Sequence, residues 1–402
     1  MFTIRNAVSG ARCIPVPLIL ITVSFFVAAQ TSSRPSSQNH AAGEASVPTE
    51  IRVESEPWWP TAGHAKRNEY VGSQACAPCH AEKFATQIKT SMGRAAARAV
   101  DSEQLRQHPD LTVSFGAYTS QFTTKNGRST LLVSDGTQST TKDLLWAVGD
   151  GRFGQTYLYR DKGGFYESQL SFYTREKALD VTTGHMQPRT LETAAGGLTT
   201  STMIRQCFGC HFTASTTEDQ FHPDEATPGL GCEACHGPGL QHVVLHTAQG
   251  DDSRGGDQLV MNPARLSPAE SVDFCGACHR TTADAELQGL AKAGINNVRL
   301  QPYRLQKSKC WGKGDARITC MACHDPHVQV VEDAASYDSK CLACHATRAE
   351  GKRSGVHAAP ACRVGTSNCV SCHMQKMEVP GTHAIFTDHW IRVVKAGAKY
   401  PE

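Results

Sequence analysis

Cysteine and histidine recur in this chain at one fixed spacing. The segment from Cys320 to His345 contains Cys-Met-Ala-Cys-His and Cys-Leu-Ala-Cys-His, with a further histidine, His327, three residues after the first of them. On a helical turn, residues i and i+3 share a face and residue i+4 continues it, so both thiols and the imidazole can reach one planar ring. The Cys-x-x-Cys-His pattern is typical of covalent haem attachment, in which the thiols form thioethers and the histidine becomes the proximal iron ligand.

The same pattern occurs seven times, and we number the motifs 1 to 7 in chain order. Composition alone, with 17 Cys and 18 His in 402 residues, would produce roughly 0.03 chance matches. Structural zinc also uses Cys-x-x-Cys pairs but does not need a histidine after each pair, and such tight loops are unusual disulfides. We therefore predict seven covalent haem c groups, attached at Cys76 and Cys79, Cys207 and Cys210, Cys232 and Cys235, Cys275 and Cys278, Cys320 and Cys323, Cys341 and Cys344, and Cys369 and Cys372, with proximal ligands His80, His211, His236, His279, His324, His345 and His373.

Composition narrows the fold and the partners. The chain is 40% hydrophobic and has a formal net charge of +2. A charge this close to zero does not predict binding to nucleic acid or contact with a membrane through a polybasic surface. The last six motifs follow one another too closely for each segment to fold alone around its haem, so neighbouring haems must cover each other. We expect a mainly α and irregular multihaem cytochrome c fold, organised by seven covalent haems, with an inserted β-rich meander domain.

The N-terminal residues resemble a secretory signal peptide. Arg5 and Arg12 precede an apolar run from Ile14 to Val27, followed by Ala28 and Ala29. This pattern predicts a signal peptide at 1–29 and export to the periplasm or another extracytoplasmic location, with an uncleaved N-terminal anchor as the alternative. The Ser- and Pro-rich residues 30–68 predict a flexible linker.

The remaining chain divides into four predicted parts. A first haem module covers 69–108, a β-rich insert 109–185, a six-haem cytochrome domain 186–392 and a C-terminal tail 393–402. In the first module, good helix formers and the absence of proline predict a helix over 81–100 that contains Met92. In the insert, short aromatic and β-branched runs are separated by turns such as Asn126-Gly127, which predicts a β-meander with Trp146, Tyr157 and Tyr159 in its core.

Several histidines outside the motifs are candidates for the second, distal iron ligand. His327 cannot cap the haem of motif 5, because a residue three positions past His324 lies on the same side of that ring, so we expect it to reach a different haem. Met92 is either a buried core methionine or an axial thioether ligand. The stronger histidine candidates are His242, His246, His327, His357, His383 and His389, and the weaker ones are His108, His185 and His222, with Met186 beside His185.

Two cysteines remain after the motifs and the signal peptide are accounted for. Cys310 and Cys362 predict a disulfide in an oxidising compartment, with two free buried thiols as the alternative.

The motif surroundings resemble a known family. GCEACHGPGLQH, DFCGACHR, QPYRL, TCMACHDPH, CLACH and NCVSCHMQKMEVPGTHAIFTDHWIR are similar to segments of multihaem c-type cytochromes related to hydroxylamine oxidoreductase and its tetrahaem electron-accepting cytochrome. The resemblance covers roughly Tyr70–Val100 and Arg205–Arg392, and implies that His242, His327, His383 and His389 are distal ligands. In the first module, Gly93 stands where many relatives have a histidine, with Met92 as its neighbour.

Three functions fit these observations. The first is an exported heptahaem cytochrome that transfers electrons between redox protein partners, which include other cytochromes or quinol-linked membrane complexes. The second is an oxidoreductase for a small nitrogen or sulfur compound at one haem with an open coordination position. The third is a structural subunit of an electron-conducting complex, in which the β insert is the docking surface.

Overall fold

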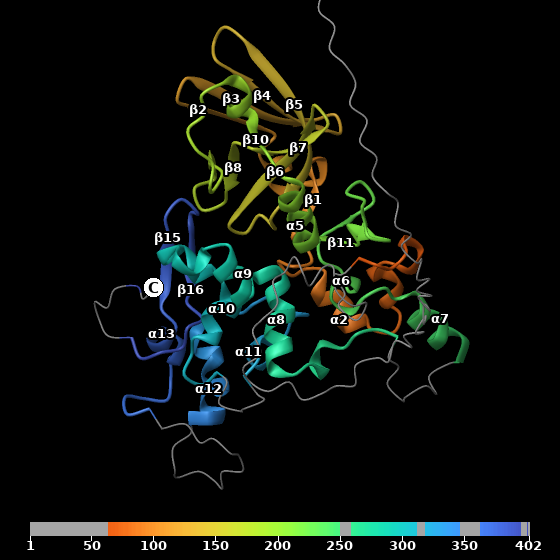
Figure 1. Ribbon diagram of the computed structural model, residues 1–402, viewed down its shortest axis with the longest axis vertical. Coiled ribbons are helices and arrows are strands. Elements are labelled where there is room, and N and C mark those ends of the chain that lie inside the picture. Colours follow the sequence, from red (N-terminus) through yellow and green to blue (C-terminus); the bar gives the residue numbers. More distant parts are fainter. Residues whose placement is uncertain (1–62, 250–258, 312–317, 346–361, 395–399, 401–402) are drawn as a thin grey trace, which may run out of the picture. The chain divides into compact units, whose positions relative to one another are not determined.

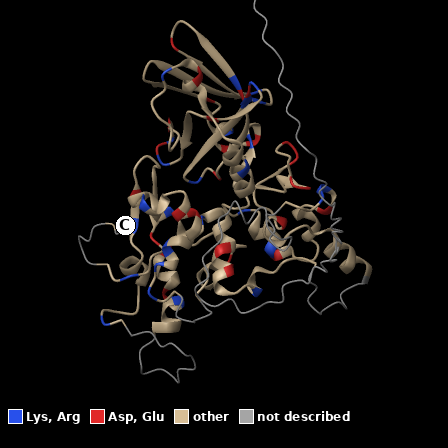
Figure 2. Cartoon of the chain, in the orientation of Figure 1, with Lys and Arg blue, Asp and Glu red and all other residues tan. Residues whose placement is uncertain are grey.

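The computed structural model of the protein describes residues 63–249, 259–311, 318–345, 362–394 and 400. The predicted signal peptide, most of the predicted linker, His357 and most of the predicted tail lie outside these residues. Within them, no helix combines the length and the apolar character needed to cross a membrane. Lys and Arg are interspersed with Asp and Glu along the described elements (Figure 2).

The first haem module contains less helix than predicted. Helix α2 (Ala81–Gln87) ends long before residue 100, and Met92 lies in the turn that follows it. The hydroxyl of Thr90 donates to the Gln87 carbonyl and accepts from the backbone N–H of Gly93. The chain then forms strand β1 (Ala96–Arg98), which pairs with residues Trp146 to Val148. Strand pairing with a distant segment therefore overrides the helix propensity of the alanines.

A ten-stranded antiparallel sheet follows (Figure 1). Its strand order is β10-β7-β6-β5-β4-β3-β2, with β1 on β5, and β8 paired to both β6 and β9. Strands β1 and β10 belong to this sheet but lie outside the predicted limits of the insert. Each pairs with a strand far from it in the sequence, β1 with β5 and β10 with β7. The bounds are β2 (Asp110–Phe115), β3 (Tyr118–Lys125), β4 (Arg128–Ser134), β5 (Ser139–Val148), β6 (Gly154–Asp161), β7 (Gly164–Ser168), β8 (Leu170–Tyr173), β9 (Ala178–Val181) and β10 (Gly196–Leu198).

Local turn chemistry explains the meander. Asn126 and Gly127 have φ of 52° and 71°, the conformation that a two-residue hairpin between β3 and β4 requires. Tyr157 and Tyr159 are buried in the core of the sheet, together with Phe122 and Phe172. Trp146 is also fully buried, but it packs in a second cluster with Phe208. Since Phe208 belongs to motif 2, this cluster joins the sheet to the first of the six later motifs.

The Cys-x-x-Cys-His motifs lie on short helical turns, as their spacing predicts. Motif 1 runs from the end of η2 (Ser73–Cys76) to the residue before α2. The other six lie on α5 (Ser201–His211), α6 (Glu233–His236 after Cys232), α8 (Pro268–His279), α11 (Cys320–Cys323), α12 (Asp338–His345) and α13 (Cys369–His373).

The elements between the motifs are short. The helices are η1 (Arg67–Glu69), η3 (Ala99–Asp101), α3 (Glu103–Gln107), α4 (Leu191–Ala195), α7 (Leu240–Gln249), η5 (Pro263–Arg265), α9 (Thr282–Leu287), η6 (Leu290–Lys292), η7 (Gly294–Arg299), α10 (Gln301–Gln306) and η8 (Ala334–Tyr337). Three two-stranded sheets pair β11 (Phe212–Thr213) with β14 (Thr227–Pro228), β12 (Thr216–Thr217) with β13 (Gln220–Phe221), and β15 (Lys376–Val379) with β16 (Ala384–Thr387).

A buried ion pair holds the C-terminal segment to the body. Arg304 of α10 forms two 2.8 Å bonds to the carboxylate of Asp388, and both side chains are fully buried. Arg392 donates to the same carboxylate. The guanidinium of Arg304 also lies 4.9 Å from the Trp390 ring centroid. These contacts fix the backbone on both sides of His389.

Candidate haem-binding site

The seven motifs surround one large cavity. Its volume is about 3190 Å³, several times the roughly 300–1000 Å³ of a site for one small molecule. Motifs 1, 3, 4, 5 and 6 contribute both cysteines and the histidine to its wall, while motifs 2 and 7 contribute Gly209 and Val370. A space of this size suits several large planar groups.

Cysteines of different motifs lie near one another. The thiols of motifs 1 and 3, 2 and 4, 4 and 5, and 6 and 7 are close enough to interact directly, in the pairs Cys76–Cys232, Cys210–Cys278, Cys275–Cys320 and Cys341–Cys369. Cys235 interacts electrostatically with the cysteines of motif 4, and Cys323 with Cys341. The attachment points therefore form one connected group.

Three motif histidines face a second imidazole ring across the cavity. A metal–imidazole bond is about 2 Å long, so two rings on opposite sides of one iron have centroids roughly 6 Å apart. The observed separations agree with this value. They are 6.2 Å for His80 and His242, 6.1 Å for His236 and His327, and 6.2 Å for His324 and His389.

The second ring nitrogen of several of these histidines is held by the protein. Nδ1 of His236 donates to the Met261 carbonyl at 2.7 Å, and Nδ1 of His389 donates to the Thr387 carbonyl at 2.9 Å. In motifs 2 and 7, Nδ1 of His211 and of His373 donate to the carbonyls of Ala95 and Arg392. An Nδ1–H bond of this kind orients the ring and leaves Nε2 for a metal.

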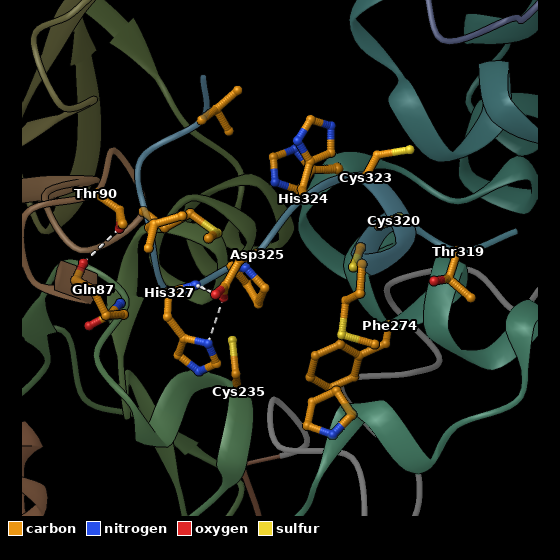
Figure 3. Close-up of a pocket in the computed structure, with 18 of the residues that line it drawn as sticks. Gln87, Thr90, Cys235, Phe274, Thr319, Cys320, Cys323, His324, Asp325 and His327 are labelled. Carbon is orange, nitrogen blue, oxygen red and sulfur yellow. Dashed lines mark hydrogen bonds and ion pairs between the residues drawn. The ribbon is translucent and has the colours of Figure 1, made fainter. Parts of the chain in front are cut away.

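His327 is held differently. Its Nδ1 and its backbone N–H each lie 2.9 Å from Oδ1 of Asp325 (Figure 3). The backbone N–H bond is the main cause that lowers the pKa of the Asp325 carboxyl to about 2. Lys83 of α2 lies 3.1 Å from the other oxygen, so the carboxylate lies between a lysine and an imidazole.

Burial favours the neutral form of the motif histidines. It lowers the pKa of His211, His236, His279 and His324, and it lowers the pKa of His389 to about 4. Iron binds the neutral imidazole, so these surroundings suit a metal ligand. The cavity, the paired thiols, the opposed rings and the anchored Nδ1 atoms together fit covalently bound haem c.

A match to a family model agrees with this fit. Residues 167–237, which contain motifs 2 and 3, match the family model for cytochrome c554 and c-prime. The match supports a multihaem c-type cytochrome. A solved structure, that of the outer cell wall cytochrome OcwA, is similar at 16% identity, with 81% of this chain and 80% of that chain covered and a TM-score of 0.38. No curated protein matches the sequence.

The other predicted ligands have different surroundings. Met92 lines the cavity, but the ring opposite His80 is that of His242. His246 lies one helical turn past His242, at 4.5 Å between ring centroids. Nδ1 of His383 lies 3.2 Å from a Glu176 oxygen.

His383 also contacts a second carboxylate, because its Nε2 lies 2.9 Å from Asp180. Since both ring nitrogens lie on carboxylates, neither is free for iron in this arrangement. The weaker candidates lie elsewhere. His108 packs on Phe172, and His185 lies between Gln169 and Glu167. His222 lines a second, smaller cavity, beside Asp224.

The predicted disulfide between Cys310 and Cys362 is wrong, because the structure forms no disulfide between these two cysteines. Cys310 lines the cavity and interacts with Cys323. Cys362 is exposed. The prediction rested on these two being the only cysteines outside the motifs and the predicted signal peptide. Their positions in the sequence do not show whether they lie close together in the fold.

Sequence reasoning missed the groups that hold the imidazoles. Four of them are backbone carbonyls, which have no sequence signature. Asp325 could have been found, because an aspartate two residues before a histidine can accept from both its backbone and its side chain.

Proposed function

We propose that the chain is an exported heptahaem c-type cytochrome that transfers electrons between redox partners outside the cytoplasm. The observation that carries this proposal is the single cavity into which all seven motifs contribute residues. Haem iron, when bound, supplies one-electron transfer between its ferric and ferrous states. The chain attaches the groups, orients their ligands and limits the access of water.

The ligand assignments follow from the opposed rings. His80 and His242 would hold the haem of motif 1, His236 and His327 that of motif 3, and His324 and His389 that of motif 5. In all three pairs the rings come from different motif segments, so each pair would join two parts of the fold. This agrees with the expectation that His327 reaches a haem other than that of its own motif.

The thiol contacts suggest the order of the attachment sites. Direct thiol interactions connect motif 1 to 3, 2 to 4, 4 to 5 and 6 to 7, and longer-range electrostatic interactions between cysteines relate motif 3 to 4 and motif 5 to 6. Thioether links at neighbouring cysteines would bring the edges of neighbouring porphyrins close together. We propose this order as the route of the electrons, with a branch at motif 4.

Export is proposed from two features. Covalent haem attachment in bacteria takes place outside the cytoplasmic membrane, and residues 1–29 have the pattern of a signal peptide. Redox proteins of that compartment, such as other cytochromes or quinol-linked complexes, would be the partners.

Intact-mass measurement and magnetic resonance of the exported protein test this function. We expect seven haem masses, low-spin ferric signals that include the three assigned haems, and rapid electron exchange with a second cytochrome. A dominant high-spin signal with turnover of nitrite or hydroxylamine would favour an oxidoreductase. Elution only as a stable assembly would favour a structural subunit. Fewer than seven haem masses would contradict the proposed count.

A further inference from the structure

The carboxylate of Asp325 connects two haem segments. Its Oδ1 accepts from Nδ1 of His327, whose ring faces His236 of motif 3. Its Oδ2 lies 3.1 Å from Nζ of Lys83, which belongs to the helix after motif 1. Both Lys83 and Asp325 line the cavity, so an occupant of the cavity would shield this pair from water.

The segment that carries His327 is held at two further points. Oε1 of Gln329 accepts from the backbone N–H of Ser91 at 2.7 Å. Farther along, Glu332 forms an ion pair with Arg152. Neither contact involves Asp325, so the position of this segment does not depend on the aspartate alone.

Asp325 differs from the groups that hold the other imidazoles. The corresponding Nδ1 atoms of His211, His236, His373 and His389 donate to backbone carbonyls, which carry no net charge. A carboxylate on Nδ1 makes an imidazole a stronger donor to a metal. It also places a negative charge close to the iron, where it stabilises the ferric state over the ferrous state. Both effects lower the reduction potential.

We propose that Asp325 is a positioning residue that lowers the potential of the haem between His236 and His327, and that Lys83 limits the size of this effect. The inference rests on the proposed function and adds a tuning device to it. Because motif 3 lies between motifs 1 and 4 in the proposed route, the device would control passage between the first haem module and the remaining haems.

Three variants test the proposal by redox titration of the holoprotein, followed by visible spectra and magnetic resonance. Asp325→Asn keeps an oxygen that can accept from His327 but removes the charge. One haem should then become easier to reduce, by a roughly tenfold change in its ferric-to-ferrous ratio, or about 59 mV. Lys83→Met should shift the same haem in the opposite direction. Glu332→Gln, which removes a charge from the same segment away from the imidazole, should leave that potential unchanged.

The His327→Ala variant identifies the haem concerned. Its low-spin signal should be lost in that variant, and the same signal should shift in Asp325→Asn while remaining low-spin. The tuning role is excluded if Asp325→Asn leaves every reduction potential unchanged or converts the signal assigned to His327 from low-spin to high-spin. It is also excluded if the Asp325 and Lys83 variants shift the potential in the same direction. If His327→Ala leaves all low-spin signals intact, the assignment of His327 fails instead, and the two failures are thus distinguishable.

Discussion

The imidazole of His242 lies opposite that of His80, with ring centroids 6.2 Å apart and 21° between the ring planes. The sequence left the second ligand of motif 1 open, because Met92, which is near His80 in the chain, could be either a core residue or an axial ligand. Helix α7 brings an imidazole to this place from a segment beyond motif 3.

We predict that His242→Ala converts the haem of motif 1 from low-spin to high-spin, because its iron loses the opposing imidazole. Met92→Leu, of similar volume, should leave the spectrum unchanged. Magnetic resonance of the ferric protein measures both. If Met92→Leu removes a low-spin signal and His242→Ala does not, the methionine is the ligand.

The C-terminal histidines should behave differently from each other. His389→Gln removes the ring that faces His324, and we expect it to abolish one low-spin signal. His383→Gln removes contacts with Glu176, Asp180 and the Tyr173 ring but no ring that faces a motif histidine, so all low-spin signals should remain. Loss of a low-spin signal in the His383 variant would show that this ring leaves its carboxylates to bind iron.

Asp388→Asn should destabilise the protein strongly. Neutralising this residue leaves the fully buried Arg304 guanidinium without its charge partner, which costs about 3 kcal/mol or more. Thermal or denaturant unfolding followed by circular dichroism measures the effect. As a control, Asp143→Asn breaks the exposed pair with Arg128 and should change the midpoint little. Similar midpoints for the two variants would mean that the buried pair does not contribute as its burial indicates.

Thiol chemistry tests the correction at Cys310 and Cys362. With no disulfide between them, one equivalent of a thiol reagent should label the exposed Cys362 in the native oxidised protein, without prior reduction. Cys362→Ser should abolish this rapid labelling and leave the unfolding midpoint unchanged. Labelling that begins only after a reductant is added would instead reveal a bridge.

Short-range features were predictable for physical reasons. Each Cys-x-x-Cys-His motif spans one helical turn, so its spacing alone brings two thiols and an imidazole to one face. Asn126 and Gly127 accept positive φ, so the turn between β3 and β4 follows from two residues. The helix over 81–100 failed because Ala96 to Arg98 pair with β5, a contact that no local propensity contains.

The sequence by itself determined where haem can be attached and that the chain between Leu111 and Val181 forms a meander, because both depend on neighbouring residues. Only the tertiary structure decided which imidazole faces which, which carbonyl or carboxylate holds each Nδ1, and that Cys310 and Cys362 form no disulfide. Such pairs come from distant segments. Their meeting depends on long-range contacts, such as Gln329 with Ser91 and Arg304 with Asp388, whose partners cannot be deduced from spacing along the chain.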